Sequence, residues 1–220
     1  MKQNIQVARL SDQQPHLKLA VIELDYVAEV IGSPPRSTSA RAHIFRYWDS
    51  IFSVAQDKGN TKKIYEDLED TVFRLLTLDR ERIDRQGLWT ICKARDGSSK
   101  NARKAYTLWT KQYSGDISEI SEEFLQKLMT DELVDLFYVT SSTVTAGMKA
   151  FVTERGWIGM GPERMMPGDV VIIVAGADVP LILRVDDRET RRLVGEAYVQ
   201  GIMDGEAVEM GLPVVDVDIY

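Results

Sequence analysis

The first hydrophobic segment of the chain is rich in β-branched residues and alternates partly between apolar and polar positions. Residues 17–27 read LKLAVIELDYV, a pattern that predicts a β-strand. The turn-forming run Gly32-Ser33-Pro34-Pro35 follows, so we expect the strand to end close to residue 30.

Four later segments repeat apolar residues every three or four positions, which places these residues on one face of a helix. They predict amphipathic helices over residues 44–55, 64–76, 102–113 and 120–137. The last helix is expected to open at Asp116, because Glu119 follows three residues later as in a capping box.

The last third of the sequence is richer in Val, Ile and Gly and has no helical periodicity. Short apolar segments over residues 150–155, 157–160, 169–175, 180–185 and 192–199 are separated by glycines and prolines. Short strands at this spacing favour a small, strongly bent antiparallel sheet or barrel.

These patterns predict an α+β fold, in which a helical segment over residues 41–137 packs on a small antiparallel β-barrel-like unit. The composition changes near Gly147. Residues 1–148 are therefore assigned to the N-terminal strand plus a mainly helical segment, and residues 149–220 to the β-rich part. The strand at 17–30 is expected to join residues 149–207 in the barrel, because an isolated strand leaves backbone groups unpaired. We expect one compact unit.

Charge and composition narrow the classes of partner. The 220 residues include 27 basic and 34 acidic side chains, a net charge of −7, and the pI is about 5.0. An acidic chain is poorly suited to nucleic acid or to anionic lipid, so we expect neither partner. The basic stretch over residues 79–104 is interpreted as a solvated loop and helix face.

The single cysteine, Cys92, rules out an internal disulfide. The longest aliphatic run, residues 170–175, is far too short to span a membrane, and residues 1–12 carry no signal-peptide core. We therefore expect a cytoplasmic protein without membrane insertion.

No standard motif for a cofactor, metal or nucleophile is present. The glycines in Gly156-x-x-Gly159-x-Gly161 lie between strand-like segments and precede Pro162, which indicates a turn and not a phosphate-binding loop. His16 and His43 have no ligand partner at metal-binding spacing, and a Cys92–His43 nucleophile pair is weakly supported. We expect no cofactor and no metal.

The densest group of polar residues follows residue 195. On a strand, Glu196, Tyr198 and Gln200 would share one face, and Asp204 and Glu206 follow in a turn around Gly205. Converging carboxylates could raise one another's pKa and leave one able to donate a proton. The structural alternative is that Asp204 bonds to backbone donors of the turn, Glu196 pairs with Arg184, and Glu206 is solvated. The residues alone favour the structural alternative.

The same region carries a resemblance to a known family. The segment Lys149-x-Phe151-x-Thr153-x-x-Gly156-Trp157-Ile158-Gly159-Met160-Gly161-Pro162 resembles the R-x-F-x-T-x-x-G-x-x-G-x-G-P block of fungal heterokaryon-incompatibility (HET) proteins. It is followed by Pro167-Gly168-Asp169-Val170-Val171 and by Leu193-Val194-Gly195-Glu196-Ala197-Tyr198-Val199-x-Gly201-Ile202-Met203-Asp204-Gly205-Glu206-Ala207. The resemblance is to the region downstream of the HET domain, so we expect no HET domain here, and Lys149 stands where the family usually has Arg. We therefore do not expect incompatibility signalling to transfer.

The resemblance implies a first hypothesis: a stand-alone, cofactor-independent cyclase or pericyclase (Diels-Alderase-like) of fungal secondary metabolism. Its substrate would be a hydrophobic, carbonyl-bearing terpenoid or polyketide bound between the helices and the barrel. We assign catalytic roles to Glu196, Tyr198 and Arg184 and substrate contacts to Trp157, Trp48, Trp109 and Met203, with Asp204, Gly205 and Glu206 as a structural turn. Trp157 is the first choice for the wall, because its neighbours Gly156 and Gly159 would leave space beside the ring.

The alternative hypothesis is a non-enzymatic regulatory or interaction module derived from an incompatibility protein. Such a module would have a filled core and an exposed apolar patch instead of a ligand-sized cavity. Homo-oligomerisation is open under either hypothesis.

Overall fold

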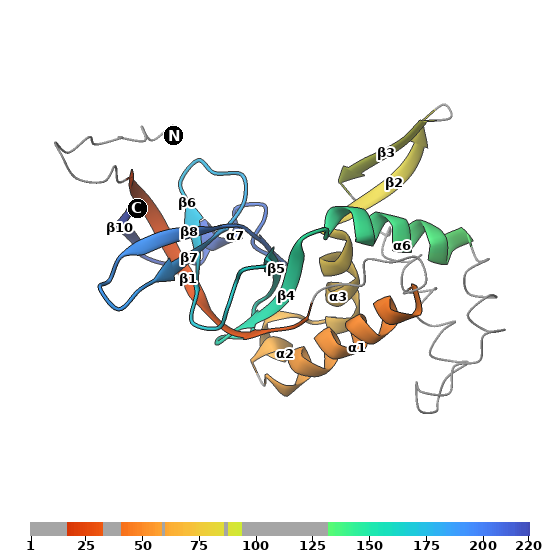
Figure 1. The fold of residues 1–220 in the computed structure, drawn as a ribbon, viewed down its shortest axis with the longest axis horizontal. Helices are drawn as coiled ribbons and strands as arrows, with labels where there is room; N and C mark the ends of the chain where they lie inside the picture. The colour runs from red at the N-terminus through yellow and green to blue at the C-terminus, as the bar shows by residue number, and fades with distance from the viewer. Residues whose placement is uncertain (1–16, 33–40, 59, 86–87, 94–131) are drawn as a thin grey trace.

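The computed structural model describes residues 17–32, 41–58, 60–85, 88–93 and 132–220 (Figure 1). The helices in this part of the chain are α1 (Arg41–Asp57), α2 (Thr61–Ile64), α3 (Leu68–Thr77), α6 (Glu132–Val144) and α7 (Glu206–Glu209). The strands are β1 (Leu17–Val30), β2 (Arg80–Arg85), β3 (Leu88–Lys93), β4 (Met148–Thr153), β5 (Ile158–Pro162), β6 (Val170–Val174), β7 (Leu181–Val185), β8 (Arg191–Glu196), β9 (Tyr198–Val199) and β10 (Val214–Ile219).

The long strand β1 organises the sheet. Its first half pairs with β10 and its middle with β6, and its last residues pair with β4. The strand order is β10-β8-β7-β6-β1-β4-β5-β9, and the additional β10–β1 pairing closes the first five strands into a ring. Register shifts at Glu23/Asp25 and at Val27/Glu29 let β1 bend from the ring into the β4-β5-β9 extension. The predicted α+β class, with a barrel-like sheet that includes the N-terminal strand, is confirmed.

Two strand predictions need correction. The predicted barrel ended at residue 207, but β10 continues the ring at Val214–Ile219. The single strand predicted over residues 192–199 is in fact two strands, because β8 pairs with β7 and β9 pairs with β5. Between them, the Ala197 N–H donates to the Pro180 carbonyl at 2.8 Å. The chain therefore crosses from the five-stranded ring to the β4-β5-β9 extension at Ala197.

The helical segment also differs from its prediction. One helix was expected over residues 64–76, but α2 and α3 are separate. Asp67 caps the N-terminus of α3, because its Oδ1 accepts a hydrogen bond from the Asp70 N–H at 2.9 Å. Residues 80–85 and 88–93, which were interpreted as part of a loop and helix face, are instead the paired strands β2 and β3, which project from the molecule in Figure 1. The helix predicted over 102–113 and the beginning of the one predicted over 120–137 lie outside the described residues.

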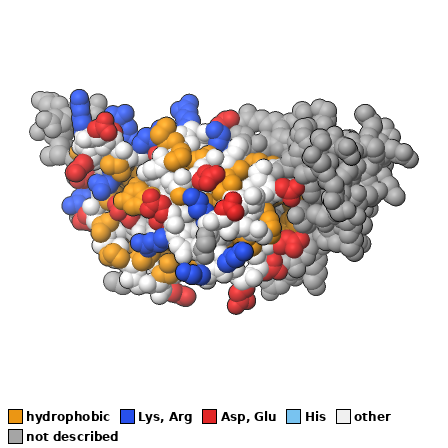
Figure 2. Space-filling view, turned by 90° about the horizontal axis from the view of Figure 1, so that it is seen from below, with side chains coloured by type: hydrophobic (Ala, Val, Ile, Leu, Met, Phe, Trp, Pro, Cys, Tyr) orange, Lys and Arg blue, Asp and Glu red, His pale blue; other side chains and the backbone are white. Residues whose placement is uncertain are grey.

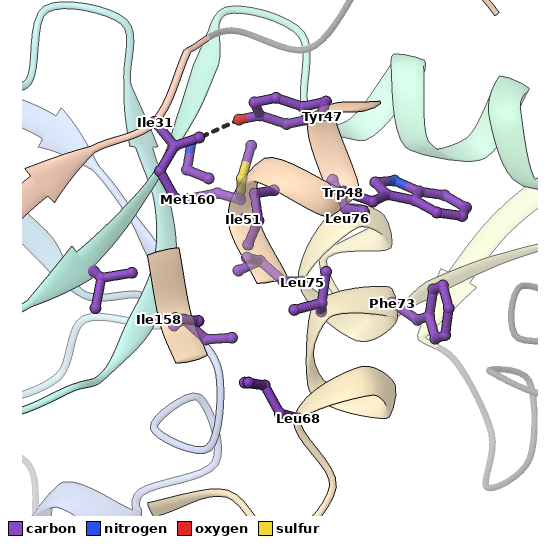
Figure 3. Close-up of a cluster of buried hydrophobic side chains, with 14 of the residues drawn as sticks. Ile31, Tyr47, Trp48, Ile51, Leu68, Phe73, Leu75, Leu76, Ile158 and Met160 are labelled. Carbon is purple, nitrogen blue, oxygen red and sulfur yellow. Dashed lines mark hydrogen bonds between the residues drawn. The ribbon is translucent and has the colours of Figure 1, made fainter. Parts of the chain in front are cut away.

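One of three hydrophobic clusters in the described residues joins the helices to the sheet. Side chains from α1 and α3, among them Ile51 and Leu75, meet Ile158 and Met160 of β5 (Figure 3). The dashed line in Figure 3 is the bond donated by the Ala150 N–H to the Tyr47 hydroxyl, at 2.8 Å. The helices are thus held against β4 and β5 by apolar packing and by the hydrogen bond between the Tyr47 hydroxyl of α1 and the Ala150 N–H of β4.

The surface is of mixed charge. On the face shown in Figure 2, basic, acidic and hydrophobic side chains are interspersed, without an extended patch of one sign. Among the helices that the structure describes, none has the length and hydrophobicity needed to cross a bilayer.

Candidate functional site

The glycines of the motif at residues 156–161 serve close packing. A Cβ on Gly156, whose φ is +100°, would lie 2.6 Å from the Thr61 backbone nitrogen. A Cβ on Gly159 would lie 2.4 Å from the Phe151 ring. The expectation that these glycines leave open space beside Trp157 is therefore wrong, because Thr61 and Phe151 fill that space.

Trp157 itself is half-buried between the two halves of the core. Its ring meets the Tyr65 ring edge to face, with centroids 6.1 Å apart. It lines neither of the two hollows described below. The structure therefore places Trp157 in the packing between α2–α3 and β5.

A hollow of about 460 Å³ lies where the helical part meets the barrel; we call it the junction hollow. The ends of α3 and α6, the start of β4, the β6–β7 turn and the β8–β9 crossing surround it. Its lining consists of Leu78, Asp79, Arg80, Val144, Met148, Asp178, Val179, Glu196, Ala197, Tyr198, Met203 and Asp204. This volume is within the range of about 300–1,000 Å³ that is usual for small-molecule sites.

Four of the residues singled out from the sequence meet in this hollow: Glu196, Tyr198, Met203 and Asp204. Glu196 and Tyr198 belong to different strands, and Glu196 is exposed whereas Tyr198 is buried. The prediction that they share one face of a single strand is therefore wrong. Both residues border the hollow because the chain crosses between the sheets at Ala197, which lies between them.

Tyr198 is the best-defined polar group of the hollow. Its hydroxyl donates a hydrogen bond of 2.6 Å to the Gln200 side-chain oxygen. Burial raises the pKa of the Tyr198 phenol, and the nearby Asp79 carboxylate raises that pKa further. The phenol is therefore a neutral hydrogen-bond donor across the physiological pH range.

An ion-pair network extends from the hollow into α3. Arg74 donates through Nε to Asp70 Oδ2 at 2.9 Å and through Nη1 to Asp79 Oδ1 at 3.4 Å. Leu78 and Asp79 both have left-handed backbone conformations, with φ of 48° and 53°. This tight end of α3 brings Asp79 to the hollow, and no local signal in the sequence marked it as a site residue.

Arg184 lies away from this group. Its Nε and Nη2 atoms donate to the two oxygens of Asp169, at 2.8 and 2.9 Å, and Nη2 also donates to the Arg164 carbonyl. The Asp169 side chain is only 2% exposed. The residue opposite Glu196 is Leu181, so the expected Glu196–Arg184 pair is wrong. Arg184 neutralises a buried carboxylate and does not line the hollow.

Trp48 lies in the core between α1, α3 and α6. It is 1% exposed, and it contacts Phe73 and Phe137 edge to face at centroid distances of 5.3 and 4.5 Å. The space beside its ring, about 10 Å³, is too small for a substrate. Trp109 is outside the described residues.

The turn after β9 has the expected position but a different hydrogen bond. Gly205 has a φ of +103°, and α7 begins directly after it. The Glu206 carboxylate accepts from the Asp204 backbone N–H at 2.8 Å. The Glu206 carboxylate thus bonds to the turn's backbone, whereas the structural interpretation of the sequence left Glu206 solvated.

A second hollow of about 410 Å³ lies beside the first; we call it the apolar groove. It is bordered by β1, β6, the β6–β7 turn, α7 and the start of β10. Its lining is mainly aliphatic and includes Ala20, Ile22, Val174, Ala177, Ile202, Ala207, Val208, Leu212 and Val214. Asp178, Val179 and Met203 line both hollows.

In the part of the chain that the structure describes, no three His, Cys, Asp or Glu side chains gather in a way that could hold a metal ion. The groups that line the junction hollow are the Tyr198 phenol, the carboxylates of Asp79, Asp178, Glu196 and Asp204, the Arg80 guanidinium and apolar side chains.

Comparison with known proteins bears on the same region. Residues 120–211 match the family model of the Het-6 beta-barrel domain. The resemblance to the C-terminal region of HET proteins is confirmed for this part of the chain. The match covers β4 to β9 and α7 but neither β1 nor β10, which complete the ring.

A curated relative supports this match. Over 66 residues the chain is 42% identical to "Heterokaryon incompatibility protein 6, OR allele" of Neurospora crassa. The matched part is 29% of this chain and 10% of that protein, so the chain corresponds to about a tenth of the relative's length. No solved structure matches the chain.

Proposed function

We propose that the chain binds a hydrophobic, carbonyl-bearing small molecule in the junction hollow and promotes its cyclisation without a cofactor. One observation carries this proposal: Glu196, Tyr198 and Met203, from the barrel, line a ligand-sized hollow together with apolar residues from the helical part. Concave sites between packed layers are common positions for ligands.

The chemistry of the hollow supports a donor role for Tyr198. Its neutral hydroxyl can exchange the Gln200 side chain for a substrate carbonyl and polarise that carbonyl. By analogy with an oxyanion-hole donor, such a bond is worth roughly 2.7–4 kcal/mol in the transition state. Glu196, exposed at the rim, can accept a hydrogen bond from a substrate hydroxyl.

A cycloaddition suits a site of this composition. It exchanges π bonds for σ bonds within the substrate, and no proton or electron has to leave. The protein then needs only to hold the diene and the activated alkene in a reactive arrangement, which by itself accelerates a reaction strongly. Leu78, Val144 and Met148 offer the apolar wall for this purpose. Terpenoid and polyketide precursors have the required chemistry.

The proposal is tested by turnover of a panel of linear polyene enones, with chelator present throughout and cyclised product measured by mass spectrometry. Tyr198→Phe should lower kcat, and Met203→Trp should abolish turnover by filling the hollow. Tyr26→Phe and Met166→Trp are the matched controls, because both residues are exposed and lie outside the hollow. If Met203→Trp turns over the enones as fast as the wild type, the reaction takes place outside the junction hollow. If the wild type neither binds nor converts any enone of the panel, the proposal is rejected.

A second candidate function is an interaction module, and the sequence match is the observation that favours it. The relative's name places it among heterokaryon incompatibility proteins. Exposed apolar side chains, such as Leu193 of β8 at 55% and Val208 of α7 at 70%, offer contacts for a partner. Sedimentation analysis separates the two functions. The interaction module would be favoured if the chain self-associates with increasing concentration, Leu193→Asp abolishes this association, and none of the enones is bound or converted.

A further inference from the structure

The apolar groove lies against the junction hollow and is not used by the function proposed above. The two hollows share Asp178, Val179 and Met203, so they have one wall in common. The groove is lined mainly by Ala, Val, Ile and Leu, whereas the junction hollow carries Asp79, Glu196, Tyr198 and Asp204. A polar and an apolar compartment thus adjoin at a single methionine and the β6–β7 turn.

We propose that the ligand is an elongated amphipathic molecule of the acyl or prenyl type, with one carbonyl end and a flexible hydrocarbon chain. Its carbonyl end lies beside Tyr198 in the junction hollow, and its chain passes Met203 into the apolar groove. This inference rests on the proposed function, because it uses the same carbonyl contact. It adds the shape of the ligand: a linear chain and not a rigid ring system.

Met203 suits the position between the compartments. It is half-buried, and its unbranched side chain can adopt several rotamers with little cost. We expect movement of this side chain to admit a narrow chain from one hollow to the other, and a wider polycyclic skeleton to be excluded.

The groove favours a hydrocarbon occupant on physical grounds. Its volume of about 410 Å³ is ligand-sized, and its lining is mainly aliphatic, with Asp178 at the end that it shares with the junction hollow. Val208 and Val214 on its rim are 70% and 62% exposed. A bound chain covers this apolar surface and is itself removed from water, so both changes favour binding.

The β10 strand supplies a matched pair of variants. Val214 lines the groove, whereas its neighbour Val215 points to the other face of the strand and does not line it. The two residues are exposed to 62% and 38%. Val214→Asp therefore introduces a charge into the groove, and Val215→Asp introduces the same charge next to it but outside the groove.

The test is calorimetric titration of the full chain with methyl ketones whose alkyl chains run from butyl to decyl. Each added methylene should tighten binding by about threefold to fourfold, until the groove is filled. Val214→Asp should remove this dependence on chain length. Val215→Asp should keep it. Tyr198→Phe should weaken every member by the same factor, because all share the carbonyl.

A rigid probe tests the shape of the ligand. Adamantyl methyl ketone has as many alkyl carbons as the decyl compound but cannot pass Met203. Its affinity should resemble that of the short ketones and should not respond to Val214→Asp. If this probe binds tightly and Val214→Asp weakens its binding, the proposal that the ligand is a linear chain is overturned.

The remaining outcomes separate this inference from the proposed function. If the butyl ketone binds and depends on Tyr198, but affinity does not rise with chain length, the groove is not part of the site and the proposed function stands. If long ketones bind without any effect of Tyr198→Phe, the carbonyl placement is wrong and both proposals fail. If no ketone binds, both fail as well. The chain could also form a dimer that dissociates in Val214→Asp but not on addition of the decyl ketone. That result would assign the groove to a second copy of the chain and would also overturn the inference.

Discussion

The hydroxyl of Tyr65 donates a hydrogen bond of 2.9 Å to the carbonyl oxygen of Gln200, although the two residues are 135 positions apart. The same hydroxyl accepts from the Ile158 N–H at 3.1 Å. One side chain between α2 and α3 thus links β5 to the loop that follows β9. It also fixes the backbone of Gln200, whose side chain accepts the hydrogen bond from Tyr198.

Tyr65→Phe should destabilise the fold by roughly 1–3 kcal/mol, because it leaves a buried N–H and a carbonyl without their shared partner. Chemical denaturation with the unfolding midpoint as readout measures the loss. Tyr26→Phe, at a residue 46% exposed, is the control and should lie close to the wild type. Equal midpoints for the two variants would show that the Tyr65 bonds carry no net stability.

Gly159→Ala should cost roughly 1–3 kcal/mol through overpacking, since the added Cβ would lie 2.4 Å from the Phe151 ring and 2.6 Å from the Tyr198 carbonyl oxygen. Gly32→Ala is the matched control, because a Cβ there meets no atom within 4 Å. The measurement is the thermal unfolding midpoint of both variants. A Gly159→Ala protein as stable as Gly32→Ala would mean that Phe151 can move aside without cost.

Arg184→Ala should lower stability by roughly 1.5–3 kcal/mol, because the nearly fully buried Asp169 carboxylate then loses a bidentate charged partner. Arg192→Ala is the comparison, since its contact with Asp186 is 3.9 Å long and exposed. Urea unfolding of the two variants compares them. A catalytic role for Arg184 predicts the opposite pattern: unchanged stability with lost turnover.

Glu206→Ala should destabilise the turn before α7 by about 1 kcal/mol, because its carboxylate accepts the Asp204 backbone N–H at 2.8 Å. Glu209→Ala removes a neighbouring carboxylate that is exposed, and it should have a smaller effect. Differential scanning calorimetry provides the comparison. A larger loss for Glu209→Ala would contradict the role given to Glu206.

Alkaline titration tests the burial of three phenols. Burial raises the pKa of Tyr47, Tyr65 and Tyr198 above the ordinary value of 10.0, so the folded protein keeps protons that the unfolded chain releases. Their contribution to stability is complete below pH 10 and is lost as the pH rises above that value. Tyrosinate absorbance recorded together with circular dichroism should show three tyrosines that ionise only as the fold is lost. Ionisation of all eight tyrosines with unchanged ellipticity would refute this.

Local pattern in the sequence was sufficient for much of the architecture. The β-branched run at residues 17–30 predicted β1, and the Gly- and Pro-separated apolar segments predicted β4 to β7 within a few residues, because alternation and turn chemistry act over short distances. The motif around Gly195 to Ala207 also marked the region in which Glu196, Tyr198, Met203 and Asp204 meet.

Tertiary structure alone decided how these pieces are used. The pairing of β10 with β1 joins the two ends of the described chain, and the crossing at Ala197 depends on a bond to Pro180, so neither leaves a mark in local periodicity. Asp79 lies at the junction hollow because of the left-handed backbone at the end of α3. Arg184 lies away from the hollow, where it pairs with the buried Asp169 carboxylate. Burial, and the need of each buried charge and backbone group for a partner, act between residues far apart in sequence. That is why the sequence could mark several residues that line the junction hollow, whereas their partners could be found only in the folded chain.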